Sequence, residues 1–429
     1  MKFLYADSID NIDPDFDFLE ERSKPGRKFF WDDQFPHEYL GFAPYDGILI
    51  SMGTVGDQKF PGKYTQAQSM RFRRVGARKF LRIDSKSLEN LDVYGDCGAF
   101  NYSGLSEPPY KPSEIIEFYD DGGFSHGCSV DHVIFQFYKN LKGIETPMDS
   151  KEKKDVLNRY EITLSNAEIF LEESKFLKGK FNPIGVVQGW SPDSMAKAAD
   201  SLVKMGYEYL ALGGMVPLSA DSIKLALDSV SKKIKKDTKI HLLGFAKIDR
   251  IKEFQKYNLY SIDTTSPLIR AFKDKKDNYF MPGKNNDLLY YTAIRIPQST
   301  ENRGLIRLIK NNLFSFEEVN TKEKNALNSL RKFDIGKAYI DEVLESIIAY
   351  SKIFLTDHHN PVKDNSEKLQ RLYSAYKVLL KKSPWKNCEC QVCKKCGIEV
   401  AIFRGSNRNK RRGMHNLYVF NNQLKKIIY

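Results

Sequence analysis

Residues 183–214 read PIGVVQGWSPDSMAKAADSLVKMGYEYLALGG, and this stretch predicts one strand, one helix and a second strand in direct succession. The first five residues are an apolar run of the length of a buried strand. Ser191 is a suitable N-cap and Pro192 suits the first helical position, and apolar residues then recur at helical spacing. Gly206 ends the helix, and the apolar run 209–212 follows at once. The stretch is therefore typical of a parallel βαβ unit.

The same alternation continues on both sides of this unit. Short apolar runs that end at a polar residue or at glycine are found at 47–51, 80–84, 91–96, 127–131, 183–188, 209–212, 240–243 and 259–263. Eight parallel strands with helices between them predict an α/β protein with a closed (β/α)8 TIM barrel, although an open doubly wound sheet fits the same local pattern.

The remainder of the chain has a different character. We expect residues 1–270 to form the catalytic barrel, residues 271–385 to form a mixed and helical accessory region inserted after it, and residues 386–429 to form a C-terminal zinc-binding subdomain packed on the barrel. The helical part of the insertion includes lysine-rich stretches such as 340–353 and 368–380.

The overall composition is that of a globular protein with a polyanionic partner. Of 429 residues, 41% are hydrophobic and 28% are charged, and the formal net charge is +12. The N-terminus is acidic and has no continuous apolar leader, and no run approaches the length of a membrane span. We therefore expect a cytoplasmic protein with no membrane partner.

Four cysteines lie within nine residues near the C-terminus and predict a metal site. Cys388, Cys390 and Cys393 are followed 22 residues later by His415, and three thiolates with one imidazole satisfy tetrahedral zinc. Four protein ligands would make this single Zn²⁺ structural. Cys396 is an alternative fourth ligand in place of His415.

Polar residues and glycines also stand where the predicted strands end. In a barrel this is where catalytic groups lie, and two carboxylates facing one cavity can divide the roles of nucleophile and proton carrier. The residues in such places are Asp96, Asp131, Gln188, Gly213, Gly214 and Asp263. Any one of the aspartates taken alone also suits the cap of a helix.

An ordered set of short motifs carries a resemblance to a known family. The motifs are D96-C-G-A-F100, G185-V-V-Q-G189, A211-L-G-G214, S261-I-D263, and C388-x-C-x-x-C393 followed by His415-Asn416. In this order and at these intervals the chain resembles the tRNA-guanine transglycosylase superfamily, over about residues 46–263 and again over 388–417.

That resemblance implies roles for the residues at the strand ends. Asp263 would be the nucleophile that forms a covalent glycosyl-aspartate, and Asp96 would be the general acid and base for the departing and incoming bases. The implied substrate-binding residues are Asp131, Gln188, Gly213, Gly214 and Phe100. Two successive displacements would retain the configuration of the sugar.

Two departures from the tRNA-modifying members bear on the substrate. Those enzymes read D-S-G-G-F-Q where this chain has D96-C-G-A-F-N101, and they carry an arginine-rich stretch where this chain has T264-T-S-P-L-I-R270. The chain is more similar to the branch that inserts 7-deazaguanines into DNA, found in bacterial modification clusters and phages.

We therefore expect replacement of guanine in DNA by a free 7-deazaguanine base of the preQ0 type, with accessory proteins of a modification cluster as further partners. The same reaction on tRNA is one alternative, and a zinc-stabilised nucleic-acid-binding paralogue without catalysis is another. A guanine in duplex DNA must be extruded before it can react, and phosphate contacts would offset that cost. The basic residues expected to supply these contacts are Lys394, Lys395, Arg404, Arg408, Lys410, Arg411 and Arg412.

Overall fold

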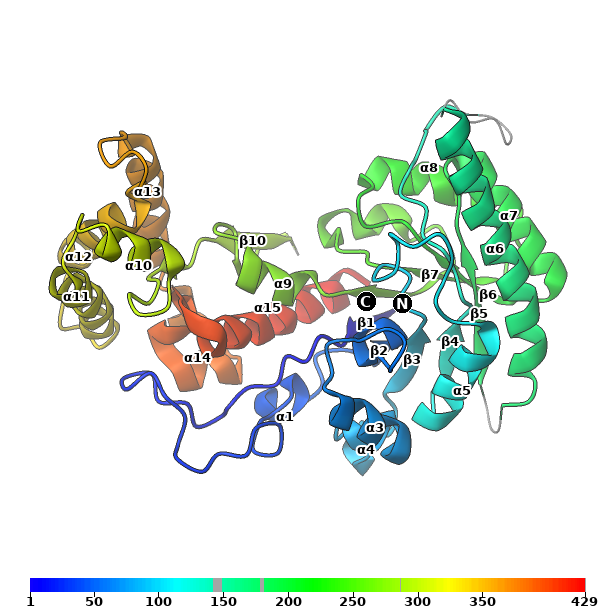
Figure 1. Cartoon of the computed structure of the whole chain (residues 1–429), viewed down its shortest axis with the longest axis horizontal. Helices are drawn as coiled ribbons and strands as arrows, with labels where there is room; N and C mark the ends of the chain where they lie inside the picture. The colour runs from blue at the N-terminus through cyan, green and yellow to red at the C-terminus, as the bar shows by residue number, and fades with distance from the viewer. Residues whose placement is uncertain (142–148, 178–180, 286, 429) are drawn as a thin grey trace. The chain divides into compact units, whose positions relative to one another are not determined.

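A computed structural model describes residues 1–429 except 142–148, 178–180, 286 and 429. The chain forms two compact units (Figure 1). The barrel unit contains Met1–Ile9, Tyr45–Thr265 and Ile427–Tyr429, and the second unit contains Asp10–Pro44 and Ser266–Lys426. The three-part division with boundaries at residues 270 and 385 stays a prediction.

Eight parallel strands close into a barrel, which confirms the predicted fold class. The strands are β1 (Lys2–Ala6), β2 (Gly47–Ser51), β3 (Asp92–Asp96), β4 (His126–Cys128), β5 (Asn182–Val187), β6 (Tyr209–Leu212), β7 (Lys239–Leu242) and β8 (Leu259–Thr264). Each strand pairs with the next in sequence, and β1 also pairs with β8 to complete the ring.

One of the predicted strands is wrong and another was missed. Residues 80–84 are not a strand, because α4 (Ala77–Phe80) runs into them and Arg82 adopts a left-handed φ of 57°. The guanidinium of Arg78 donates to three carbonyl oxygens of the following loop and holds it in this irregular form. The place in the barrel is taken by β1 at the N-terminus, whose short apolar run is followed by several aspartates.

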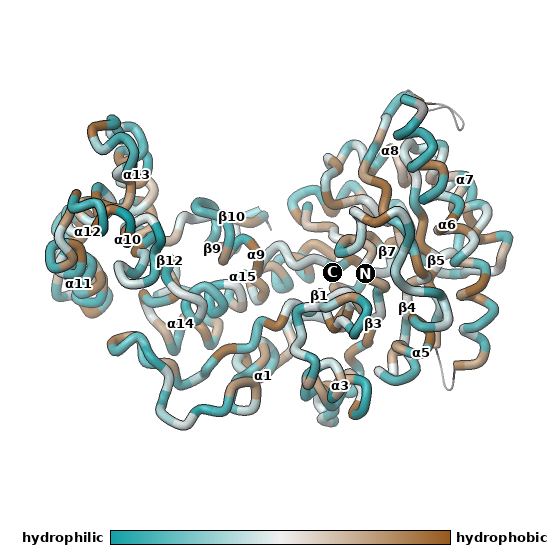
Figure 2. The backbone as a smooth tube through the Cα atoms, in the orientation of Figure 1, coloured by the Kyte–Doolittle hydropathy of each residue, from teal (hydrophilic) through white to brown (hydrophobic). Residues whose placement is uncertain are grey.

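Helices surround the strands of the barrel unit. They are α2 (Met52–Val55), α3 (Gln66–Val75), α4, α5 (Pro112–Gly122), α6 (Ser150–Ser174), α7 (Pro192–Met205) and α8 (Ala220–Val230). The signals expected for α7 are all confirmed, since the Ser191 hydroxyl accepts from Ser194 N and Gly206 ends the helix with φ 116°. Teal and brown alternate along α7 in Figure 2, as expected of a helix that buries one face.

Alternate residues of each strand fill the barrel interior. The buried cluster inside consists of Leu4, Leu49, Tyr94, Cys128, Ile184, Val186, Tyr209 and Ala211. Because side chains in a strand alternate between faces, Asp96 points to the same side as Tyr94. The carboxyl ends of the strands therefore place inward-facing polar groups above an apolar floor.

The second unit combines small sheets, a helical layer and the cysteine-rich segment. Its elements are α1 (Pro36–Leu40), α9 (Ser266–Lys273), β9 (Tyr279–Pro282), β10 (Leu288–Tyr291), β11 (Ile294–Arg295), α10 (Arg303–Lys310), α11 (Phe316–Asp334), α12 (Ile340–Leu355), α13 (Ser366–Lys382), α14 (Gln391–Cys396), β12 (Ile402–Phe403) and α15 (Gly405–Ile428). One buried apolar cluster of this unit contains residues from α10, α11, α12, α13 and α14. Among the described residues, no helix combines the length and apolar character that crossing a membrane requires.

Candidate active site and metal centre

The cysteine cluster assembles four potential metal ligands in the second unit. One ligand atom each of Cys388, Cys390, Cys393 and His415 lies within 4.8 Å of the others. His415 Nδ1 is 3.5, 3.4 and 3.3 Å from the three sulfur atoms. Tetrahedral zinc with ordinary Zn–S and Zn–N bond lengths requires a separation of about 3.5 Å between sulfur and nitrogen. The four residues therefore fit a tetrahedral metal ion.

The surroundings of His415 orient its ring for this role. Its Nε2 lies 2.6 Å from Phe280 O, to which it donates, so Nδ1 carries the lone pair that could bind a metal ion. Tyr279 stacks on the imidazole with the ring centroids 4.5 Å apart. Cys396, the alternative fourth ligand, lies outside the cluster and contacts Tyr39 Oη at 3.5 Å.

The barrel unit brings the predicted polar residues to one end of the barrel. Asp96 and Asp263 lie at the carboxyl ends of β3 and β8. Asp131, Gln188 and the pair Gly213-Gly214 follow β4, β5 and β6. The sequence could predict this set because the carboxyl ends of parallel strands meet at the same rim.

Asp96 lies at the half-buried end of β3, and its carboxyl group, which faces the barrel interior, has a raised pKa. Burial raises the pKa of its carboxyl group to about 7, and the nearby carboxylates of Asp131 and Asp263 add to the rise. Gly98 N donates to Asp96 Oδ2 at 3.0 Å, and Ser51 at the end of β2 hydrogen-bonds to the same group. A carboxyl group with this pKa exists in both protonation states near neutral pH, so it can give and accept protons.

Asp263 is buried and held by two donors on one oxygen. Gly244 N donates to Oδ1 at 2.8 Å, and His241 Nε2 lies 3.2 Å from the same atom. No described residue hydrogen-bonds to Oδ2. One carboxylate oxygen is therefore anchored while the other is left without a protein donor.

Asp131 and Gln188 form a rigid pair beside Asp96. Gln188 Nε2 donates to Asp131 Oδ2 at 2.7 Å, and the Cys97 thiol donates to Asp131 Oδ1 at 3.1 Å. Burial raises the pKa of Asp131, while both hydrogen bonds act in the opposite direction. Gln188 Oε1 in turn accepts from Ile134 N at 3.1 Å. The two side chains present a fixed array of donors and acceptors suited to a planar heterocycle.

The glycine pair leaves no room for side chains. A Cβ on Gly213 would lie 2.2 Å from Gln188 Nε2, and a Cβ on Gly214, where φ is 70°, would lie 2.7 Å from Ile134 O. Glycine at both positions therefore preserves the geometry of Gln188 and keeps the backbone accessible.

Two aromatic rings stand at this end of the barrel. Phe100, expected to bind substrate, is 60% exposed, and its ring centroid lies 5.4 Å from that of Phe135, which is 41% exposed. Exposed aromatic rings can stack on a nucleobase. Phe135 was missed because it stands in an irregular segment with no periodic signal.

His241 and Cys97 were also missed as members of the site. His241 is completely buried on β7, where it reads as an interior residue of an apolar strand. Cys97 is likewise buried, and the sequence gives no sign that its thiol contacts Asp131. Only the pairing of β7 with β8 shows that His241 lies beside the acidic residue.

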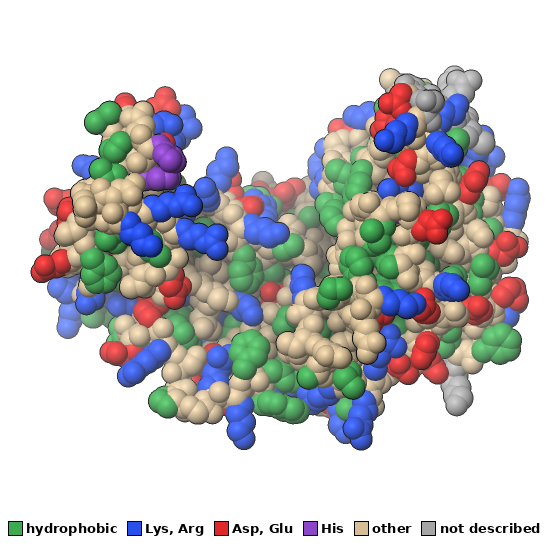
Figure 3. Space-filling view, in the orientation of Figure 1, with side chains coloured by type: hydrophobic (Ala, Val, Ile, Leu, Met, Phe, Trp, Pro, Cys, Tyr) green, Lys and Arg blue, Asp and Glu red, His purple; other side chains and the backbone are tan. Residues whose placement is uncertain are grey.

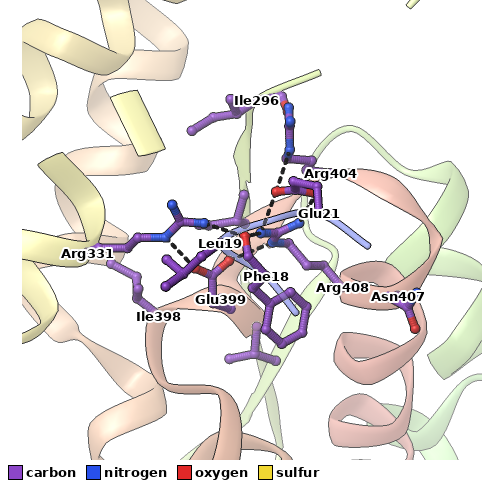
Figure 4. A network of polar contacts seen from close by, with 12 residues as sticks. Phe18, Leu19, Glu21, Ile296, Arg331, Ile398, Glu399, Arg404, Asn407 and Arg408 are labelled. Atoms are coloured by element: carbon purple, nitrogen blue, oxygen red, sulfur yellow. Dashed lines mark hydrogen bonds and ion pairs between the residues drawn. The ribbon is translucent and has the colours of Figure 1, made fainter. Parts of the chain in front are cut away.

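The expected phosphate-binding role of the C-terminal arginines is wrong. Arg404, Arg408, Arg411 and Arg412 are each at most 5% exposed. Figure 4 shows Arg404 and Arg408 turned towards Glu21, with Glu399 between Arg331 and Arg408.

Each of these guanidinium groups has hydrogen-bond partners inside the second unit. Arg408 is 2.6 Å from Glu399 and 2.8 Å from Glu21, while Arg411 and Arg412 donate to backbone carbonyl oxygens at 2.6 Å. Lys410 donates to Asn11 O at 2.9 Å. Of the expected set, Lys394 and Lys395 remain exposed, and Lys394 pairs with Glu389.

The chain is similar to a named protein along almost its whole length. No protein-family profile matches the chain. The chain is 38% identical over 429 residues to a protein of Salmonella montevideo named DNA-guanine transglycosylase. The aligned region covers 99% of this chain and 97% of that protein.

Proposed function

The chain belongs to the DNA-guanine transglycosylase family, and we propose that it replaces guanine in DNA with a 7-deazaguanine through a covalent glycosyl-aspartate. It is a transglycosylase, an enzyme that transfers a pentosyl group between bases. The observation that carries the mechanistic part is the pair of acidic groups at the barrel mouth. The negative charge of Asp263 contributes to the raised pKa of Asp96.

In the first step Asp263 Oδ2 attacks the anomeric carbon of the target nucleotide. The bond from that carbon to guanine N9 breaks, and its electron pair leaves with the base. Oδ1 remains anchored by Gly244 N and His241, which supports attack by the other oxygen. Asp96, with a pKa of about 7, supplies a proton to the departing purine.

In the second step the incoming 7-deazaguanine attacks the same carbon. Asp96 accepts the proton from the incoming nitrogen, the ester bond to Asp263 breaks, and the carboxylate is restored. Two inversions give net retention, as in other transfers through a glycosyl-carboxylate. Asp131 and Gln188 would bind the edge of either base, since their mutual hydrogen bond fixes both side chains beside Asp96. Phe100 would stack on it, and Gly213 and Gly214 would bring backbone groups close.

The Cys388, Cys390, Cys393 and His415 cluster would hold one Zn²⁺. A metal ion with four protein ligands has no open coordination position, so it would tie α14 to α15 and take no part in base exchange.

The polymer and the base are tested together. Purified protein is incubated with a preQ0-type base and either plasmid DNA or bulk tRNA, and the nucleosides of each polymer are then analysed by mass spectrometry. A 7-deazaguanine nucleoside in the DNA digest alone is expected. Its appearance in tRNA alone would replace the DNA assignment by the tRNA alternative.

The covalent step is tested by trapping. Wild-type protein should form a denaturation-resistant adduct with DNA, and Asp263→Ala should form none. Asp237→Ala removes an exposed aspartate near the start of β7, at the opposite end of the barrel strands, and should behave as wild type. An adduct that survives Asp263→Ala would show that another residue is the nucleophile, and no adduct or exchange with any polymer would favour the non-catalytic paralogue.

A further inference from the structure

Because the C-terminal arginines are buried, other basic side chains must contact the phosphates of the substrate. A protein with a net charge of +12 that extrudes a nucleotide needs exposed cations to hold the phosphates on either side. Arg404, Arg408, Arg411 and Arg412 do not supply them, since all four are buried. Exposed and unpaired basic groups must therefore be sought elsewhere.

The helix α10 carries such groups in a regular array. Its sequence is RGLIRLIK, with three basic and no acidic side chains. Arg303, Arg307 and Lys310 are spaced i, i+4 and i+7, so they share one face of the helix. All three are exposed, and none makes an ion pair or a side-chain hydrogen bond within the described part of the chain.

The opposite face fixes the helix to the second unit. Leu305 and Leu308 are at most 1% exposed and belong to the apolar cluster of that unit. The side chain of Asn302 accepts from Gly304 N and Leu305 N and caps the first turn. The basic face therefore stands on a firmly packed helix, which fixes the backbone positions from which its three side chains extend.

On α13, by contrast, two of the basic side chains lie close to acidic ones. Arg371 pairs with Glu367 at 3.0 Å, and Lys377 lies 3.9 Å from Asp341. The nearest acidic residues to α10 in sequence are Glu301 and Glu317, both outside the helix. Figure 3 shows Lys and Arg side chains gathered over the part of this unit where Figure 1 labels α10.

We propose that the face formed by Arg303, Arg307 and Lys310 binds the phosphate backbone of the DNA substrate. This inference rests on the proposed function, which takes DNA as the polymer. The three side chains extend over about 10 Å along the helix, which matches about three nucleotides of one strand. Arginine also donates to phosphate oxygens in a bidentate manner, and two of the three residues are arginines.

The test measures affinity without requiring catalysis. The full-length triple variant Arg303→Gln/Arg307→Gln/Lys310→Gln is titrated against a fluorescent duplex at several salt concentrations. The control Lys232→Gln/Lys233→Gln/Lys236→Gln removes the same charge from exposed positions between α8 and β7, at the opposite end of the barrel strands from the site. Circular dichroism verifies that both variants are folded.

For the triple variant we expect Kd to rise about tenfold or more, and the slope of log K against log salt to fall by about three. The control should retain the slope of the wild type. An unchanged slope in the triple variant, an equal loss in the control, no binding of duplex by the wild type, or a loss of affinity for RNA alone would each overturn the proposal.

These outcomes are separable from failure of the proposed function. If wild-type protein binds DNA through α10 and exchanges no base, the catalytic proposal is wrong and the binding surface stands. If base exchange in DNA proceeds while the triple variant binds as tightly as wild type, the proposed binding surface is wrong and the catalytic proposal stands.

Discussion

His241 Nε2 lies 3.2 Å from Asp263 Oδ1, while the Nδ1 atom of the same ring lies 2.6 Å from Ser261 Oγ. With the Nε2 proton donated to the carboxylate, Nδ1 accepts from the Ser261 hydroxyl. Ser261 Oγ is also 2.5 Å from Tyr209 Oη, which is 3.4 Å from Tyr94 Oη. A buried chain of hydrogen bonds across the barrel interior thus sets the orientation of the imidazole, which makes His241 a positioning residue for Asp263.

Replacing His241 should therefore lower kcat more than it changes KM. His241→Leu removes the donor to Oδ1 and should reduce kcat by about 100-fold, because small misplacement of a reacting group costs this much. His241→Gln keeps an N–H donor and should retain more activity. Steady-state kinetics of base exchange measures both variants, and equal losses in the two would argue against positioning through this hydrogen bond.

The raised pKa of Asp96, about 7, predicts a pH-dependent stability. The folded protein binds this proton more tightly than the unfolded chain, so the group destabilises the fold progressively as pH rises from about 4 to about 7. Asp96→Asn should therefore raise the unfolding midpoint at pH 8 and have little effect at pH 4. Thermal melts of both proteins at the two pH values test this, and a lower midpoint for the variant at pH 8 would contradict it.

The same pKa predicts a feature of the rate profile. The wild-type plot of kcat/KM against pH should show an inflection near 7 that arises from Asp96. Asp96→Asn should lose both this inflection and most of the activity. Retention of the inflection in residual activity would assign it to another group.

Metal content discriminates between the two possible fourth ligands. Elemental analysis should find one zinc per chain in wild-type protein, and Cys390→Ala should lose the ion and much of the fold of the second unit. Cys396→Ala should keep the ion, since Cys396 lies outside the cluster and contacts Tyr39. Loss of zinc from Cys396→Ala, with zinc retained in His415→Ala, would reverse the assignment.

The buried arginines should affect stability and leave the affinity of the folded protein for DNA unchanged. Arg408→Ala removes one of the two arginine partners of Glu399 and of Glu21, which keep Arg331 and Arg404, and the lost charged hydrogen bonds should lower the free energy of unfolding by about 1 to 3 kcal/mol. Lys394→Ala, which removes an exposed charge, should leave the unfolding midpoint almost unchanged. Denaturant melts and DNA titrations on both variants measure the two effects, and a weaker salt dependence for folded Arg408→Ala would contradict this view.

Much of the fold and half of the site followed from local sequence patterns. Helix α7 with its caps Ser191 and Gly206 was predictable because caps, a first-turn proline and helical periodicity all act within a few residues. The candidate ligands Cys388, Cys390 and Cys393 were predictable for a similar reason, since their spacing alone suits a metal. Asp96 and Asp263 were placed at one rim because consecutive parallel strands all end on the same side.

Only the tertiary structure decided the environment of those groups. The pKa of Asp96 depends on burial and on carboxylates that belong to other strands, and His241 meets Asp263 only because β7 pairs with β8. One of the two acidic partners of Arg408 is Glu21, and no local pattern reveals a pairing across nearly the whole chain. Sequence determined which groups the protein carries and where each strand presents them, whereas solvation and charge depend on distant neighbours, because Coulomb and desolvation energies act through space rather than along the chain.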